Sequence, residues 1–221
     1  NKLKNDIFGV GALLQGDKSG DGKLAVNSAL VSAAFHKGLD KNHKHFIGLG
    51  VQFAYSQTSL KLQQLSFPLQ FSGGDFNSAI SNGESISKPN MNTFDLHAGI
   101  LQQSTIKDFL GIMTGFSVYH LIEPKQSFLG QKIRLTDRFV VHEGLRFKVQ
   151  KHFYITPNFI FQYQNKAKEI NLGTACEYHI PAKKTEAVVS LGGWYRLQDA
   201  AIVTAGLEYY KARLLFAYDV N

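Results

Sequence analysis

Residues 46–55 read FIGLGVQFAY, and this stretch decides the fold class because its residue types alternate strictly. Ile47, Leu49, Val51, Phe53 and Tyr55 would share one face of a strand, whereas the positions between them are mostly glycine, alanine and glutamine. An apolar face opposite a small or polar face is typical of a strand in an antiparallel sheet. The stretch therefore predicts a β-strand, and the same period-2 pattern recurs along the chain.

Repetition of this pattern predicts about eleven strands, with no convincing helix between them. Only 58–66 has an ambiguous helical pattern. The composition agrees: among 221 residues, 12% are aromatic, 20 are glycine and 19% are charged, which is typical of a β protein. We expect a single domain over 1–221. The expected strands are 7–15, 24–37, 46–55, 93–103, 109–121, 139–150, 153–164, 169–180, 187–197, 201–210 and 213–220.

Three features favour a membrane barrel over a soluble sandwich. Many expected strands run for about ten to fourteen residues, longer than the usual ~5–6. Charged residues such as Arg146, Glu177, Arg196 and Glu208 fall in mid-strand on the polar face, where a water-filled lumen keeps them hydrated. Short and long connections alternate, as periplasmic turns and surface loops do. The predicted fold is an all-β, transmembrane, antiparallel up-and-down β-barrel of the bacterial outer membrane.

Aromatic residues near the expected strand ends fit the interface girdles of such barrels. The residues concerned are Tyr119, Tyr163, Tyr178, Trp194, Tyr195, Tyr209, Tyr210 and Tyr218.

Composition excludes several classes of protein. The single cysteine, Cys176, rules out a disulfide framework and a multi-cysteine metal site, and we expect it to be buried and inert on an apolar face. No run approaches about 18 apolar residues, so no transmembrane helix is expected. The net charge of +7 is spread over turn-like pieces, and we therefore expect no nucleic-acid binding.

Metal-binding patterns are incomplete. Residues 17–22 (DKSGDG) begin like a calcium loop, but Ser28 stands where the bidentate glutamate belongs, so a surface turn is expected. His43 and His45 are two apart, and a zinc site needs at least three convergent ligands. We expect no metal site and no cofactor.

Catalytic constellations are equally incomplete. Ser117 with His120, or Ser190 with His142, are the pairs that a membrane lipid hydrolase could use, but the chain has no Gly-x-Ser-x-Gly elbow. His120 and His142 are expected to be hydrated residues facing the lumen. No catalytic residue is assigned.

The long connection 58–92 is the best candidate for a functional segment, because long connections in compact domains are usually functional or disordered. Its apolar and acidic side chains suit either a docking surface for a secreted protein or a lid that plugs the lumen. A second long connection, 123–137, is basic and suits an acidic partner. The expected partner-binding residues are Phe67, Phe71, Asp75, Phe76, Lys125, Lys132 and Arg134.

Several stretches, taken in order, resemble the PorP/SprF family of outer-membrane proteins, which is associated with the type IX secretion system of Bacteroidetes-type bacteria. They are GVGA at 9–12, DKSGDG at 17–22, FSVYHL at 116–121, EPKQSF at 123–128, YITPNF at 154–159, KEINLG at 168–173, LGGWYR at 191–196, GLEY at 206–209 and FAYDVN at 216–221.

The resemblance implies a non-enzymatic outer-membrane barrel that anchors or displays a secreted surface protein carrying a C-terminal secretion domain and contacts other type IX secretion components. It also implies further strands before Asp6 and after Asn221. With the even-count rule, about fourteen strands are expected in the full chain. Besides these proteins, the expected partner is outer-membrane lipid. The alternative function is a diffusion channel for small solutes.

Overall fold

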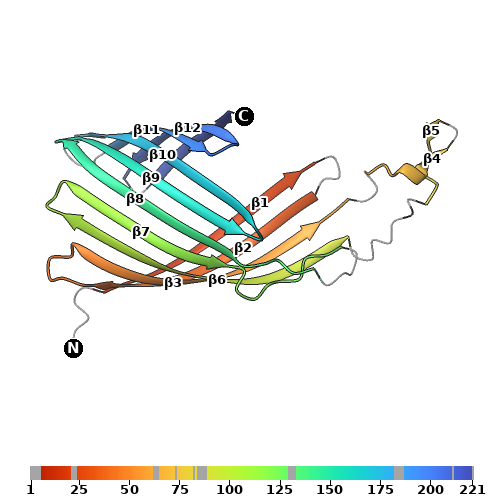
Figure 1. Cartoon of the computed structure of the whole chain (residues 1–221), viewed down its shortest axis with the longest axis horizontal. Helices are drawn as coiled ribbons and strands as arrows, with labels where there is room; N and C mark the ends of the chain where they lie inside the picture. Colours follow the sequence, from red (N-terminus) through yellow and green to blue (C-terminus); the bar gives the residue numbers. More distant parts are fainter. Residues whose placement is uncertain are drawn as a thin grey trace.

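The computed structural model describes residues 6–20, 24–61, 65–72, 74–81, 83, 89–128, 133–181, 187–210 and 212–220. Its main element is one antiparallel sheet of eleven strands, ordered β1-β2-β3-β6-β7-β8-β9-β10-β11-β12-β13, and each strand pairs with its neighbour in the chain (Figure 1). β4 and β5 form a separate two-stranded sheet. The bounds are β1 Ile7–Ser19, β2 Leu24–Gly38, β3 His45–Ser59, β4 Phe71–Ser72, β5 Asp75–Phe76, β6 Asn90–Ile106, β7 Leu110–Tyr119, β8 Arg138–Gln150, β9 Phe153–Gln164, β10 Ala167–Ile180, β11 Ala187–Arg196, β12 Ala200–Tyr209 and β13 Ala212–Val220.

The eleven strands of the main sheet are the eleven predicted from the alternating pattern. Several are longer than predicted: β1 continues to Ser19 and β6 begins at Asn90. Asp17 and Lys18 therefore pair with β2 as strand residues, and the start of the calcium-like stretch is not a loop. The pattern did not predict β4 or β5, and no helix is found in the described parts of 58–66.

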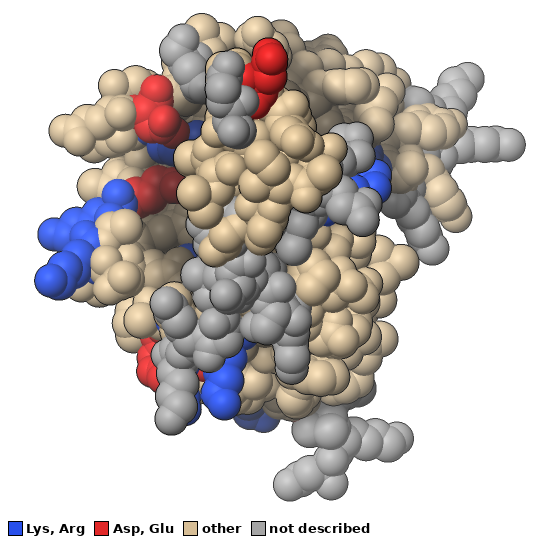
Figure 2. Space-filling view, turned by 90° about the vertical axis from the view of Figure 1, so that its right-hand side faces the viewer, with Lys and Arg blue, Asp and Glu red and all other residues tan. Residues whose placement is uncertain are grey.

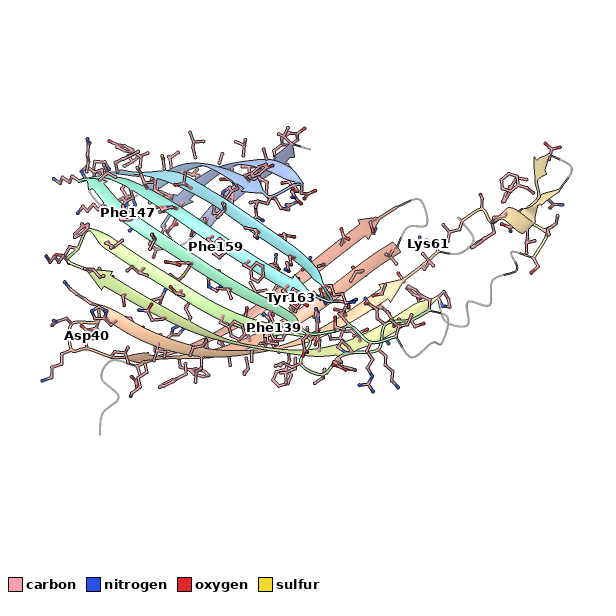
Figure 3. All side chains as sticks on the ribbon, viewed as in Figure 1. Asp40, Lys61, Phe139, Phe147, Phe159 and Tyr163 are labelled. Atoms are coloured by element: carbon pink, nitrogen blue, oxygen red, sulfur yellow. The ribbon has the colours of Figure 1, made fainter. Side chains whose placement is uncertain are left out.

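Both long connections lie at one end of the sheet, as predicted, and the short turns at 165–166 and 197–199 lie at that end too. The 60–89 and 120–137 connections lie at one end, and the turns at 39–44, 107–109 and 151–152 lie at the other (Figure 1). Figure 2 looks onto the end with the long connections, where most described residues are neither acidic nor basic. Figure 3 marks Asp40 in a turn at the opposite end.

The sheet curves but does not close on itself. Among the described residues, β1 pairs only with β2 and β13 only with β12. The predicted barrel is thus present as an open, curved sheet of eleven strands. Backbone groups on an edge strand must find partners in a membrane, so further strands stay a prediction.

Burial is inverted relative to a water-soluble protein. On β3, the apolar side chains from Ile47 to Tyr55 are exposed, and Leu49 keeps 63% of its surface accessible. Among the described residues, the buried hydrophobic side chains are small or medium: Ala54, Val140 and Ala200. We name the face that includes Leu49 and Val51 the outer face, and the face that includes Gln52 and Ala54 the inner face. Lipid, rather than a protein core, is the medium that would cover this apolar outer face.

The inner face carries paired charges. Arg146 on β8 lies 3.0 Å from the Glu177 carboxylate on β10, and its guanidinium stacks over Tyr154 at 3.8 Å. Arg196 binds Asp219 on β13 at 3.0 Å. The mid-strand charges predicted for a lumen therefore face one another instead of being only hydrated.

Two expectations about single side chains were wrong. Cys176 is exposed on the outer face rather than buried, because that face has no protein layer over it. Trp194 and Tyr119 do not belong to an outer aromatic girdle. Trp194 packs over the inner-face Gly173, and Tyr119 packs against His97. Among the described residues, no helix is long and apolar enough to cross a membrane.

Candidate functional site

The first part of the candidate site is the segment 65–81, which contains β4 and β5 and projects beyond the strand ends (Figure 1). A short 3-10 helix, η2 Pro68–Gln70, leads into β4, and Pro68 suits its first position because it has no N–H to satisfy there. Phe71 pairs with Phe76 across the two strands, and their ring centroids lie 5.5 Å apart. Gly74, at φ +95°, supplies the backbone conformation that closes the turn.

Gln70 organises this segment, although the sequence analysis did not single it out. Its side-chain oxygen accepts the Phe67 amide at 3.0 Å, and its side-chain nitrogen donates to the Ile80 carbonyl at 3.2 Å. Its own carbonyl accepts the Asn77 amide at 2.8 Å. Gln70 is buried, so these bonds satisfy the amide and hold both arms of the segment together.

The segment brings four predicted contact residues close together, three of them in the β4–β5 hairpin. Phe71 and Phe76 keep 56% and 46% of their surfaces exposed, and Asp75 is exposed beside them. Phe67 is half-buried at the start of η2. Large apolar side chains grouped at the tip of a polar connection are typical of a protein contact rather than of a solvated loop.

The second part is the basic connection 120–137. Lys125 and Arg134 form an isolated antiparallel bridge, so the two residues lie side by side. Both are exposed, and Arg134 lies 3.6 Å from the Glu123 carboxylate, which offsets part of its charge. Lys132 lies outside the described residues. The structure therefore brings two of the three predicted basic residues together.

A cluster missed in the sequence analysis lies at the base of this connection. Asp95 and His97 sit two apart on the inner face of β6, and His120 follows the last residue of β7. Nδ1 of His120 hydrogen-bonds to Oδ2 of Asp95, and the His120 amide donates to Nδ1 of His97 at 3.2 Å. We name these three residues the Asp–His cluster. His120 is thus engaged with a carboxylate rather than simply hydrated.

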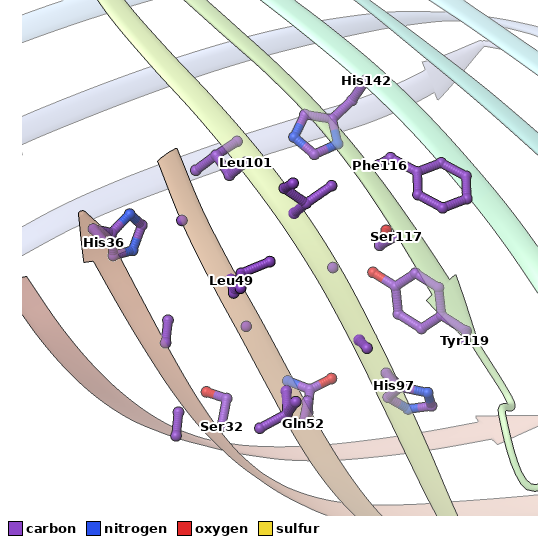
Figure 4. Close-up of a pocket in the computed structure, with 18 of the residues that line it drawn as sticks. Ser32, His36, Leu49, Gln52, His97, Leu101, Phe116, Ser117, Tyr119 and His142 are labelled. Carbon is purple, nitrogen blue, oxygen red and sulfur yellow. The ribbon is translucent and has the colours of Figure 1, made fainter. Parts of the chain in front are cut away.

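A cavity of about 400 Å³ adjoins the cluster on the inner face (Figure 4). Its lining includes His97, Tyr119, His142 and Ser117, and the His142 ring lies over Gly115. Neither predicted serine–histidine pair is joined by a hydrogen bond among the described residues. Ser117 pairs across strands with Val140 and Ser190 with Gly206, both on the inner face.

Comparison with solved structures reveals a similar fold. A crystal structure of an outer-membrane channel from Pseudomonas putida F1 matches 96% of this chain and 87% of its own, with a TM-score of 0.54 and 7% sequence identity. At this identity the similarity concerns the fold alone. A search of curated proteins found no match.

The family comparison covers the whole chain. The family model for the type IX secretion system membrane protein PorP/SprF matches residues 1–221. This match, the apolar outer face and the similarity to an outer-membrane channel place the protein in the outer membrane. The chain belongs to the PorP/SprF family of type IX secretion system membrane proteins.

Proposed function

We propose that this protein is a non-enzymatic partner in type IX secretion that anchors or displays a secreted surface protein. The observation that carries the proposal is the hairpin of β4 and β5, which holds Phe71 and Phe76 exposed beyond the strand ends. A rigid sheet that projects an apolar tip suits binding, because desolvating large aromatic side chains is a main source of affinity at interfaces.

The position of this hairpin favours docking over plugging. A lid would fold back across the inner face, but the segment extends away from the strands (Figure 1). The basic pair Lys125 and Arg134 lies in the other long connection at the same end. An acidic surface on the secreted protein would be attracted by this pair, which speeds association at low salt.

Co-purification from native outer membranes tests the docking site. The double variant Phe71→Ser/Phe76→Ser should lose a secreted protein that carries a C-terminal secretion domain, as identified by mass spectrometry. The matched control is Phe109→Ser, because Phe109 is 49% exposed in a turn at the opposite end. Retention of the secreted protein by the double variant would refute this docking site.

A diffusion channel is the second candidate function, favoured by the similarity to an outer-membrane channel and by the charged inner face. Reconstitution of the full-length protein into a planar bilayer distinguishes the two functions. Steady ion conductance without any partner would support the channel. Absence of conductance, together with loss of the secreted protein from the Phe71→Ser/Phe76→Ser variant, would support docking.

A further inference from the structure

We propose that the Asp–His cluster binds one divalent transition-metal ion, with Zn²⁺ as the best match. Asp95, His97 and His120 each offer one ligand atom, and these three atoms lie within 4.8 Å of one another. Two imidazoles and one carboxylate form a common set of protein ligands for zinc, with a water molecule in the fourth position.

The burial of the cluster suits a bound ion. The side chains of Asp95, His97 and His120 are 10%, 9% and 16% exposed. Asp95 and His120 also line a second cavity, of about 430 Å³, between β2, β3, β6 and the 120–137 connection. Ligand atoms this shielded interact strongly with a cation, and the adjoining cavities give an ion and a water molecule a route to them.

The surroundings hold the ligands in place. The second oxygen of Asp95 accepts the Leu96 amide at 2.8 Å. The Tyr119 ring packs against His97 at 4.8 Å, and Arg138 in turn stacks on Tyr119 at 4.3 Å.

Metal binding would move the proton that lies between His120 and Asp95. The cation would take its place beside Nδ1 of His120; a neutral imidazole would then carry its proton on Nε2, and an imidazolium would release one proton to water. The His120 amide donates to Nδ1 of His97 at 3.2 Å, so a cation bound at that nitrogen would have to displace this hydrogen bond.

The alternative is a purely hydrogen-bonded cluster that ties the 120–137 connection to β6. Under both hypotheses, substitution of Asp95 or His120 should loosen this connection. Only the metal-site hypothesis predicts tight, stoichiometric ion binding that depends on all three residues. The deciding measurement is therefore ion binding itself.

Metal-free, full-length protein in detergent should be titrated with Zn²⁺ by calorimetry, and with Co²⁺ by visible absorption, which reports coordination geometry. We expect one ion per chain. Asp95→Asn, His97→Asn and His120→Asn should each weaken binding by at least about 100-fold, because changes even outside the ligands cost about 10–100-fold. The matched control is His179→Asn, an inner-face histidine on β10 that contacts Arg146 and lines neither cavity, which should bind as the wild type does.

A gel-mobility assay that separates folded from unfolded protein should be run on each variant to check that it retains its fold. Two results would overturn the proposal: no stoichiometric binding by the folded wild type, or unchanged affinity in the three cluster variants. The exposed His43 with nearby His45 is a competing surface site. Loss of binding in His43→Asn/His45→Asn, with binding retained in the cluster variants, would also overturn the proposal and assign the ion to that turn.

Discussion

The outer and inner faces of the sheet differ in what they pack against. Leu191 on β11 points outward and keeps 64% of its surface exposed, whereas its neighbour Ser190 is half-buried on the inner face. Successive residues of a strand point to opposite faces, so the period-2 pattern of the sequence decides which side chains lie on the outer face and which on the inner face. The apolar band is thus an adaptation to lipid as solvent, and the inner face acts as the protein's polar interior.

The two faces also use glycine differently. On the inner face, a Cβ added at Gly173 would overlap the Trp194 ring and lie 2.7 Å from the Gly193 carbonyl. On the outer face, a Cβ added at Gly193 would meet no atom within 4 Å. The inner face is therefore packed against its own side chains, while the outer face leaves space that lipid fills.

A charge placed on the outer face should have the largest effect. Leu191→Arg should destabilise the protein by about 2–4 kcal/mol, the cost of arginine near the bilayer midplane. Ser190→Arg is the matched control and should cost less, because its side chain enters the polar interior. Guanidinium unfolding of the protein in lipid vesicles measures both. Equal costs would refute the assignment of the two faces.

Adding a methyl group to each of the two glycines should have the next largest effect. Gly173→Ala should cost about 1–3 kcal/mol, since overpacking forces the Trp194 ring or the backbone to move. Gly193→Ala should leave stability unchanged or slightly raised, because space is open there. The same unfolding assay, with Trp194 fluorescence as the probe, measures both variants. A harmless Gly173→Ala would contradict the tight inner packing.

The ion pairs on the inner face should contribute less to the stability of the fold than the glycine packing does. Arg196 binds Asp199 at 2.6 Å and Asp219 at 3.0 Å, with its side chain 27% exposed. Arg196→Gln should cost about 1 kcal/mol, and the cost should shrink at high salt. Arg213→Gln is the control, because the Arg213 side chain is 61% exposed and its 3.6 Å contact with Glu208 should contribute little to stability. A salt-independent loss at Arg196 would point to packing instead of charge.

Sequence alone predicted the sheet well, because lipid outside and polar groups inside force strict alternation on strands such as β3. It predicted strand ends less well. The expected strand 93–103 extends from Asn90 to Ile106, since residues beyond the lipid band can be polar on both faces. The sequence analysis singled out Phe67, Phe71, Asp75 and Phe76 in a long connection, and their role in binding stays a prediction. It did not find Gln70 or the β4–β5 pairing, because these depend on hydrogen bonds within the connection.

The Asp–His cluster could not be predicted, because His120 lies 25 residues from Asp95 in the sequence and meets it only through the register of β6 and β7. The expected turn at 104–108 ended the strand too early. The observed β6 continues to Ile106, which places Val118 opposite Ala98 and brings His120 to Asp95. A shift of a few residues in a hairpin therefore decides whether the three side chains converge.

The turn that contains Asp40 lies at one end of the sheet, beyond both faces. A substitution of Asp40 should therefore have the smallest effect of the changes considered. Its carboxylate accepts amide hydrogen bonds from Asn42, Lys44 and His45. Partial desolvation raises the pKa of Asp40, but these amides at His45, Lys44 and Asn42 outweigh it and hold the pKa below the usual 3.8. Because the folded pKa is depressed, the stabilisation is present above the unfolded pKa and is lost as the pH falls through the folded value.

Asp40→Asn should therefore speed hydrogen exchange at the Lys44 and His45 amides at neutral pH, while the difference from wild type should disappear in acid, below the pKa of the folded carboxyl. The effect should stay local, because the amides bound by Asp40 belong to the turn and to His45 at the start of β3. A difference that persists in acid would mean that the amide-for-carboxyl exchange disturbs the shape of the turn rather than its charge. In that case the shape of the turn would help to set the register between β2 and β3.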